Sequence, residues 1–216
     1  MIKNILFDLD GTLTDPKQGI VSCIDYALAK MGVSAPDNTD FTKYIGPPLQ
    51  QAFSEILKTD NTDLIDKAIG YFRERFKVKG QYENDVYEGI QVLLEQLGSN
   101  GYRLFIATSK PEVFAESILK HFNLAGYFTA IHGSQLDGTR SDKGELISWV
   151  LTTETLEPDT TIMIGDRKHD ITGATVNQLK SIGVLWGYGS KEELETAHAT
   201  YLCDAVAEIK TIIQSL

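Results

Sequence analysis

Two aspartates near the N-terminus could do chemistry together. Asp8 and Asp10 lie in the segment Asp8–Thr14 (DLDGTLT), directly after an apolar run that begins at Ile2. Residues at i and i+2 on a strand point to the same side, so both carboxylates would face one site. Gly11 would let the backbone approach a ligand closely. An Asp-Gly pair is also ordinary turn chemistry, but paired carboxylates at a strand end favour a reactive site.

Polar residues recur at other points where the sequence predicts a strand end or a helix start. Thr108-Ser109 closes one predicted strand, Lys143 opens a predicted helix, and Gly165–Asp170 (GDRKHD) follows another predicted strand. Ligands of open α/β sheets bind beyond the carboxyl ends of the strands. We therefore expect these segments and Asp8–Thr14 to meet in one crevice.

The elements that would position these residues form a regular pattern. Short apolar segments without strict polar alternation predict strands that are buried on both faces of a parallel sheet, and helical patterns lie between them. The predicted strands are Ile2–Leu9, Tyr102–Thr108, Phe128–His132, Thr161–Gly165 and Ser181–Trp186, and the predicted helices are Gly89–Gly98, Pro111–Phe122 and Lys143–Leu151. Strand and helix in alternation predict an α/β fold with a doubly wound, Rossmann-like parallel sheet.

Residues 16–80 interrupt this alternation, because their patterns are helical and no convincing strand lies among them. The predicted helices of this block are Gly19–Met31, Pro48–Leu57 and Asp63–Lys77. A helical block directly after the first strand predicts an inserted domain with hinges near residues 15–17 and 80–85. We therefore expect an α/β core of residues 1–15 and 81–216 and a small, all-helical cap domain of residues 16–80.

Composition narrows the classes of partner. The 216 residues include 20 basic and 30 acidic side chains, which gives a formal net charge of −10 at pH 7. That balance argues against a nucleic acid or an anionic membrane surface as the main partner, since both favour a basic patch. An anionic substrate would then need local positive charge from a metal ion or a placed lysine.

Cysteine usage and the N-terminal segment bear on the cellular compartment that we expect for this protein. Cys23 and Cys203 lie far apart without metal-ligand spacing, so we expect a reducing, cytoplasmic setting rather than a disulfide framework. The apolar run within MIKNILFDLDG is too short for a signal peptide. No stretch approaches the roughly 18 apolar residues that a membrane span needs.

The sequence resembles the haloacid dehalogenase superfamily, in its phosphatase branch with a helical cap inserted after the first motif. DLDGT, Thr108-Ser109, Lys143 and GDRKHD match that superfamily's four motifs in order, and the resemblance spans essentially the whole chain. KYIGPPLQ in the cap and SIGVLWGYGS near the end are most similar to the phosphoglycolate phosphatase and 5′-nucleotidase-like groups. These groups often carry an alanine-glycine pair where this chain has Ala174–Gln178 (ATVNQ).

The resemblance implies a role for each carboxylate. Asp8 would attack phosphorus and form an aspartyl-phosphate, and Asp10 would protonate the leaving oxygen and later accept a proton from water. Asp8, Asp166 and the backbone carbonyl of Asp10 would hold Mg²⁺, which prefers oxygen ligands. Asp170 would contribute to the metal site, through water or by orienting Lys143, or would cap the helix that follows.

The same resemblance implies the groups that bind the phosphoryl oxygens. Thr108, Ser109 and the amides near Gly11 would donate hydrogen bonds to them. Lys143 would supply the fixed positive charge. Arg167 lies within a motif and could reach the mouth of the site, but simple exposure is the favoured expectation.

These features together predict a Mg²⁺-dependent phosphatase that acts on a small phosphorylated metabolite, such as phosphoglycolate or a nucleoside 5′-monophosphate. A phosphomutase acting on a sugar phosphate would use the same core residues and stays an alternative, although KYIGPPLQ favours the phosphatase. An inert binding module on this fold is a further alternative, but it would predict a lost motif residue, and all are present. The candidates for setting specificity are the cap residues Lys17, Tyr44, Ile45 and Gly46.

Overall fold

The structure, a computed structural model, describes residues 1–34 and 39–216. The chain divides into two compact units. The first comprises Met1–Asp15 and Val86–Leu216, and the second comprises Pro16–Asp85. The second unit is therefore an insertion between two segments of the first.

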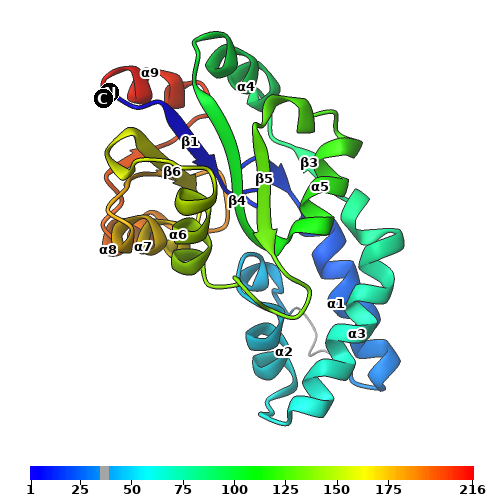
Figure 1. The fold of residues 1–216 in the computed structure, drawn as a ribbon. Helices are drawn as coiled ribbons and strands as arrows, with labels where there is room; N and C mark the ends of the chain where they lie inside the picture. Colours follow the sequence, from blue (N-terminus) through cyan, green and yellow to red (C-terminus); the bar gives the residue numbers. More distant parts are fainter. Residues whose placement is uncertain (35–38) are drawn as a thin grey trace. The chain divides into compact units, whose positions relative to one another are not determined.

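The first unit is built on a six-stranded parallel sheet (Figure 1). Its strands are β1 (Asn4–Phe7), β4 (Arg103–Pro111), β5 (Ala130–Ser134), β6 (Thr161–Gly165), β7 (Lys180–Val184) and β8 (Tyr201–Cys203). Their order is β5-β4-β1-β6-β7-β8, so the N-terminal strand lies centrally between β4 and β6. Ile5, Leu6 and Phe7 of β1 are fully buried, as expected for a strand covered on both faces. The predicted α/β fold, a parallel sheet with an inserted helical unit, is confirmed.

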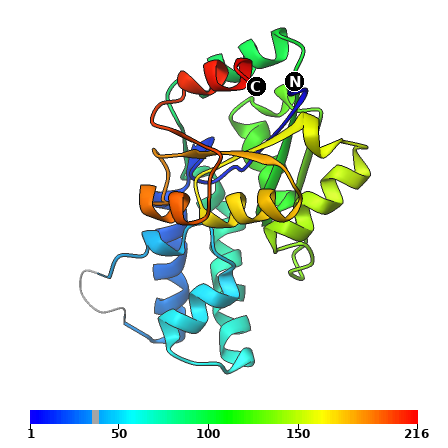
Figure 2. The ribbon, with the colours of Figure 1, turned by 90° about the vertical axis from the view of Figure 1, so that its left-hand side faces the viewer.

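Helices connect the strands of this sheet (Figure 2). They are α4 (Ile90–Ser99), α5 (Glu112–His121), α6 (Lys143–Thr153), α7 (Lys168–Val176), α8 (Lys191–Thr196) and α9 (Glu208–Gln214), with short 3₁₀ turns at η3 (Ala125–Tyr127) and η4 (Pro158–Thr160). Leu6, Phe105 and Met163 from three neighbouring strands pack in one cluster with Leu146 and Ile147 of α6. This cluster fixes the start of α6 against the centre of the sheet.

The end of β4 and the edge strand β8 differ from the sequence prediction. Pro111 ends β4 with an extended backbone (ψ 129°), and α5 begins one residue later at Glu112. The fixed φ of proline suits either position. The edge strand β8 has no counterpart among the predicted strands, because its three residues are too few to form a recognisable apolar pattern.

The second unit is helical. Its elements are α1 (Lys17–Met31), η1 (Thr42–Tyr44), α2 (Leu49–Leu57), α3 (Thr62–Val78) and η2 (Gly80–Tyr82). Phe72 of α3 is central to its apolar core, with ring centroids 6.2 Å from Phe53 and 5.4 Å from Phe76. Asn61 caps α3 by accepting a hydrogen bond from the amide of Leu64. Aromatic packing between α2 and α3 therefore holds these helices together.

The second unit ends at Asp85, within the predicted hinge at residues 80–85 and five residues after the predicted domain boundary at residue 80. The amide of Gly19 in α1 donates to the carbonyl of Glu83. A Cβ atom at Gly19 would overlap the carbonyl oxygen of Gly80, so η2 lies directly against α1. This close backbone packing ties the segment after α3 to the inserted helices. The short strands β2 (Thr14–Asp15) and β3 (Asp85–Val86) lie at the two junctions.

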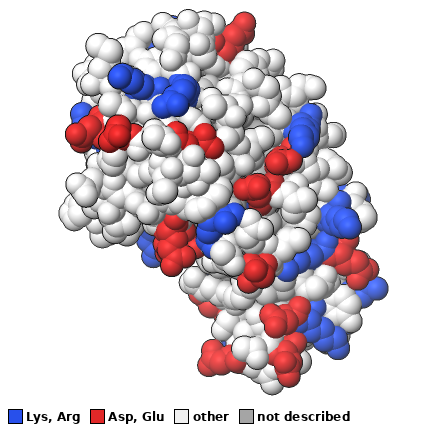
Figure 3. All heavy atoms as spheres, viewed as in Figure 1, with Lys and Arg blue, Asp and Glu red and all other residues white. Residues whose placement is uncertain are grey.

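The surface carries charges of both signs. On the face that Figure 3 shows, acidic and basic side chains of the described residues are interspersed. Within residues 1–34 and 39–216, no helix combines the length and the apolar character that crossing a membrane would require.

Candidate active site

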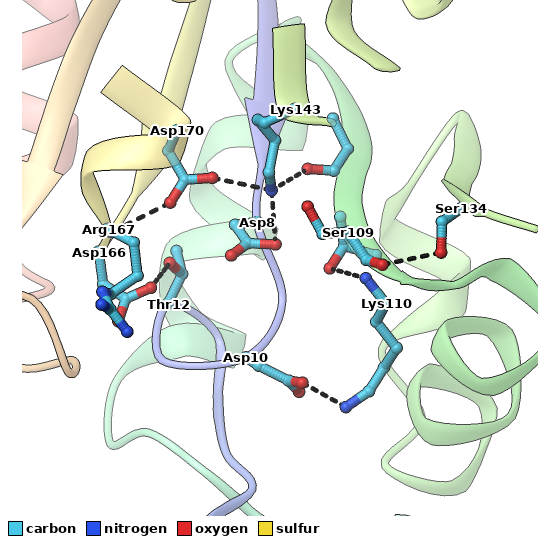
Figure 4. Close-up of polar contacts among 12 residues, drawn as sticks. Asp8, Asp10, Thr12, Ser109, Lys110, Ser134, Lys143, Asp166, Arg167 and Asp170 are labelled. Atoms are coloured by element: carbon cyan, nitrogen blue, oxygen red, sulfur yellow. Dashed lines mark hydrogen bonds and ion pairs between the residues drawn. The ribbon is translucent and has the colours of Figure 1, made fainter. Parts of the chain in front are cut away.

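The carboxyl ends of three adjacent strands bring the predicted motif residues together (Figure 4). Asp8 follows β1, Thr108 lies near the end of β4, and Asp166 follows β6. β1 pairs with both β4 and β6, so these three positions are neighbours at one edge of the sheet. The three residues are at most 6 % exposed. The crevice that the sequence predicted is therefore a largely buried, polar site.

Lys143, the first residue of α6, lies at the centre of this site. Its Nζ atom is 3.0 Å from Oδ1 of Asp8, 2.8 Å from Oδ1 of Asp170 and 2.9 Å from the carbonyl oxygen of Ala107. Burial alone would lower the pKa of this lysine, but the carboxylates of Asp170 and Asp8 raise it above its ordinary value. The side chain is therefore a fixed positive charge.

Asp8, Asp166 and Asp170 form a compact trio of carboxylates. Each offers one oxygen, and these oxygens lie within 4.8 Å of one another. Burial raises the pKa of Asp166 well above its usual range, and the charges of Asp170 and Asp8 raise it further. Lys143 pairs with two of these carboxylates, Asp8 and Asp170. Its single charge does not offset the negative charge of all three carboxylates, so a cation with oxygen ligands would fit here.

Asp166 is enclosed by backbone as well as side chains. The amide of Tyr188 donates to its Oδ2 atom at 2.7 Å, and the hydroxyl of Thr12 lies 3.4 Å from its Oδ1 atom. A Cβ atom at Gly11 or Gly187 would overlap the Asp166 carboxylate, so both glycines allow a close approach. Neither Thr12 nor Tyr188 was given a role from the sequence, although Thr12 lies in DLDGT and Tyr188 lies in SIGVLWGYGS.

A substitution at Gly189 tests this enclosure, because a Cβ atom there would overlap the backbone oxygen of Asp166. We expect Gly189→Ala to lower the free energy of unfolding by about 1–3 kcal/mol, since overpacking forces the backbone to shift. Gly98→Ala is the matched control: its Cβ would meet nothing within 4 Å, and we expect a gain of about 0.4–1 kcal/mol. Denaturant unfolding measures both, and equal stability of the two variants would contradict the prediction.

Asp170 does not cap α7 in the predicted way. Arg167 occupies the N-cap position, and Oδ2 of Asp170, three residues later, accepts a hydrogen bond from the Arg167 amide at 3.1 Å. Burial raises the pKa of Asp170 to about 6, although Lys143 opposes the shift. Arg167 is not simply exposed either, because its Nε atom donates to Glu193 at 2.9 Å and its side chain is only 12 % exposed. The early turn of α7 thus aims Asp170 at Lys143.

The predicted phosphate-binding residues Thr108, Ser109 and Gly11 lie near Asp8, and each makes a different hydrogen bond. The Oγ1 atom of Thr108 accepts from the amide of Lys110 at 3.3 Å, and the hydroxyl hydrogen of Thr108 stays available to donate. The Ser109 carbonyl accepts from Ser134 at 2.8 Å. The Gly11 amide donates to the carbonyl of Thr14 at 2.7 Å, so Gly11 contributes close backbone approach rather than its own amide.

The Asp10 carboxylate lies outside the carboxylate trio and pairs with Lys110 (Figure 4). Both side chains are nearly buried, at 12 % and 7 % exposure. Burial raises the pKa of Asp10, and the charge of Lys110 offsets part of that rise. Lys110 directly follows Thr108-Ser109 but was given no role from the sequence.

The chain is similar to several known proteins. The family model described as haloacid dehalogenase-like hydrolase matches residues 5–184. A 5′-nucleotidase of Pseudomonas aeruginosa is 46 % identical, over 98 % of this chain and 96 % of that protein. The tyrosine-protein kinase PtkA of Mycobacterium tuberculosis is 34 % identical, over 93 % of this chain and 68 % of that protein. The crystal structure of a predicted phosphatase from Clostridium acetobutylicum superposes with a TM-score of 0.95 at 45 % identity, and the match covers both chains completely.

Proposed function

The chain belongs to the haloacid dehalogenase-like hydrolase family, and we propose that it is a Mg²⁺-dependent phosphatase that hydrolyses small phosphate monoesters through an aspartyl-phosphate. The observation that carries this proposal is the setting of Asp8. Its carboxylate follows the central strand, 3.0 Å from the buried ammonium group of Lys143 and within a trio of carboxylates. The relatives named as a 5′-nucleotidase and a predicted phosphatase support the same class of reaction.

In the first step, a carboxylate oxygen of Asp8 would bond to phosphorus while the bond between phosphorus and the ester oxygen breaks. Lys143 would orient Asp8 and attract the phosphoryl oxygens, because its charge is fixed by two carboxylates. Thr108, which is 2 % exposed at the end of the neighbouring strand, would donate its hydroxyl to a phosphoryl oxygen.

Asp10 would transfer the protons in both steps. It would protonate the ester oxygen as the alcohol leaves, and it would then take a proton from the water that attacks the aspartyl-phosphate. That second step would release inorganic phosphate and restore the Asp8 carboxylate. The position of Asp10 two residues after Asp8 places both carboxylates at the same strand end.

The carboxylate trio supports a bound Mg²⁺ ion. Asp8, Asp166 and the backbone carbonyl of Asp10 would hold it, and Asp170 would contribute by orienting Lys143 at 2.8 Å. When bound, the ion would neutralise negative charge on the phosphoryl oxygens. The trio and a phosphate ester would otherwise crowd negative charge into one buried site.

A substrate screen tests the proposed function. We expect inorganic phosphate release to be fastest with nucleoside 5′-monophosphates, because the relative from P. aeruginosa is named as a 5′-nucleotidase. The matched control is the 3′-monophosphate of each nucleoside, which carries the same base and charge. Phosphoglycolate and hexose monophosphates complete the panel. No release from any ester would contradict the proposal, and faster isomerisation than release with a hexose monophosphate and its bisphosphate would indicate a mutase.

A second candidate is phosphoryl transfer to tyrosine, since one relative is named as a tyrosine-protein kinase. The same aspartate could accept a phosphoryl group and pass it to a phenol instead of water. Incubation with ATP followed by mass spectrometry of the tyrosine-containing peptides separates the two. Phosphotyrosine formed at a rate above that of phosphate release would favour this second candidate.

A further inference from the structure

Lys110 lies in a bulge at the carboxyl end of β4. β4 and β5 pair Thr108 with Gly133 and Pro111 with Ser134, so Ser109 and Lys110 are additional residues in β4. A bulge next to an active site redirects the side chains that it carries. Lys110 therefore does not follow the regular alternation of the strand.

Several contacts hold this bulge in one shape. The amide of Lys110 donates to Thr108 at 3.3 Å, and the hydroxyl of Ser134 donates to the Ser109 carbonyl at 2.8 Å. A Cβ atom at Gly133 would overlap the backbone of Lys110 and Glu112, so β5 can approach only because that residue is glycine. The backbone thus determines where the Lys110 side chain starts.

The side chain of Lys110 ends on Asp10. Its Nζ atom forms an ion pair with Oδ2 of Asp10, and the two side chains are 7 % and 12 % exposed (Figure 4). Lysine is rarely this buried unless it is paired. Among the described residues, the other carboxylate oxygen of Asp10, Oδ1, is buried without a hydrogen-bond partner. One oxygen of Asp10 is therefore held by Lys110, and the other is left for a different molecule.

We propose that Lys110 is a positioning residue, which holds Oδ2 of Asp10 so that Oδ1 carries the proton given to the leaving oxygen. The inference rests on the proposed phosphatase function. In the first step the proton would pass from Oδ1 to the ester oxygen, as the bond from phosphorus to that oxygen breaks and the bond from phosphorus to Asp8 forms. In the second step a water proton would return to Oδ1.

This role has a consequence for leaving groups. When Asp10 gives up its proton it becomes a carboxylate beside the Lys110 ammonium, so the ion pair strengthens as the proton moves. That gain matters only where the leaving oxygen needs a proton. An aliphatic alkoxide is a poor leaving group and needs one, whereas p-nitrophenolate leaves readily without one.

The test measures kcat/KM of Lys110→Met with aliphatic phosphate monoesters and with p-nitrophenyl phosphate. We expect kcat/KM to fall about 100-fold for the aliphatic esters, which is the lower end of the effect of losing a general acid. For p-nitrophenyl phosphate we expect kcat/KM to fall less than about tenfold. Asp10→Asn should show the same selectivity. The double variant should be no slower on aliphatic esters than Asp10→Asn alone, because both changes remove one function.

Three further variants make the test specific. Lys120→Met removes an exposed lysine that pairs with Glu116 on α5, and it should leave every rate unchanged. Lys110→Arg should recover part of the rate on aliphatic esters. Lys110→Gln keeps a hydrogen-bond donor on a side chain of similar length. It replaces Lys110→Met in the test if thermal unfolding shows that Lys110→Met does not fold. Its selectivity between aliphatic esters and p-nitrophenyl phosphate should be intermediate.

Two outcomes would overturn the inference alone. An equal loss on all esters would mean that Lys110 acts on the shared phosphoryl group. A further loss in the double variant, beyond Asp10→Asn, would mean that Lys110 acts independently of Asp10. If wild-type protein released no phosphate from any ester, the proposed function would fail, and the inference with it.

Discussion

Asp8→Asn is expected to lower kcat/KM at least about 1,000-fold for every phosphate ester, which corresponds to a loss of about 4 kcal/mol of transition-state stabilisation. An amide cannot take the phosphoryl group as the carboxylate would. The fold should persist, because asparagine has nearly the same shape and Lys143 keeps Asp170 as a partner at 2.8 Å. Phosphate release and thermal unfolding of the same preparation measure the two effects.

Asp159→Asn is the matched control for that experiment. Asp159 is an exposed residue of η4, at the amino end of β6 and therefore opposite the candidate site along the strand. Its substitution removes one carboxylate and should leave the rate unchanged. Acid quenching of wild-type protein during turnover should also trap a phosphoryl group on the peptide that contains Asp8. Substantial turnover by Asp8→Asn would refute the nucleophile assignment.

Removing divalent metal with EDTA is expected to reduce phosphate release at least about 100-fold, and Mg²⁺ should restore it, because metal charge stabilisation is worth several kcal/mol. A second readout is independent of turnover. Oxygens of Asp8, Asp166 and Asp170 are buried within 4.8 Å of one another, and Lys143 pairs with Asp8 and Asp170, so a bound cation should relieve the remaining repulsion. Mg²⁺ at about 100 times its Kd would stabilise the folded protein by about 2.7 kcal/mol.

Asp166→Asn separates this binding effect from a general salt effect. The variant should lose most of the Mg²⁺-dependent rise in Tm, whereas Asp159→Asn should keep it. Equal stabilisation of both variants by Mg²⁺ would argue against the carboxylate trio as the metal site. Full activity in excess EDTA would argue against metal dependence itself.

The sequence determined the parts of this protein that depend on short-range patterns. The apolar run before Asp8, the strand TIMIG before Asp166 and the capped helix start at Lys143 each specify an element by local burial and capping. Because ligands of parallel α/β sheets bind at the strand ends, those elements were enough to predict where the motif residues would meet. The same patterns predicted an inserted helical block, with a hinge at residues 80–85 that includes its end at Asp85.

Only the tertiary structure decided which groups touch within the site. Lys110 reaches Asp10 because β4 lies beside β1 and because a bulge redirects its side chain. The amide of Tyr188 reaches Asp166 because β7 lies beside β6 and two glycines permit close approach. Contacts of this kind join residues that are 22 or 100 positions apart. They depend on strand order, register and bulge geometry, which an apolar pattern along the chain does not encode.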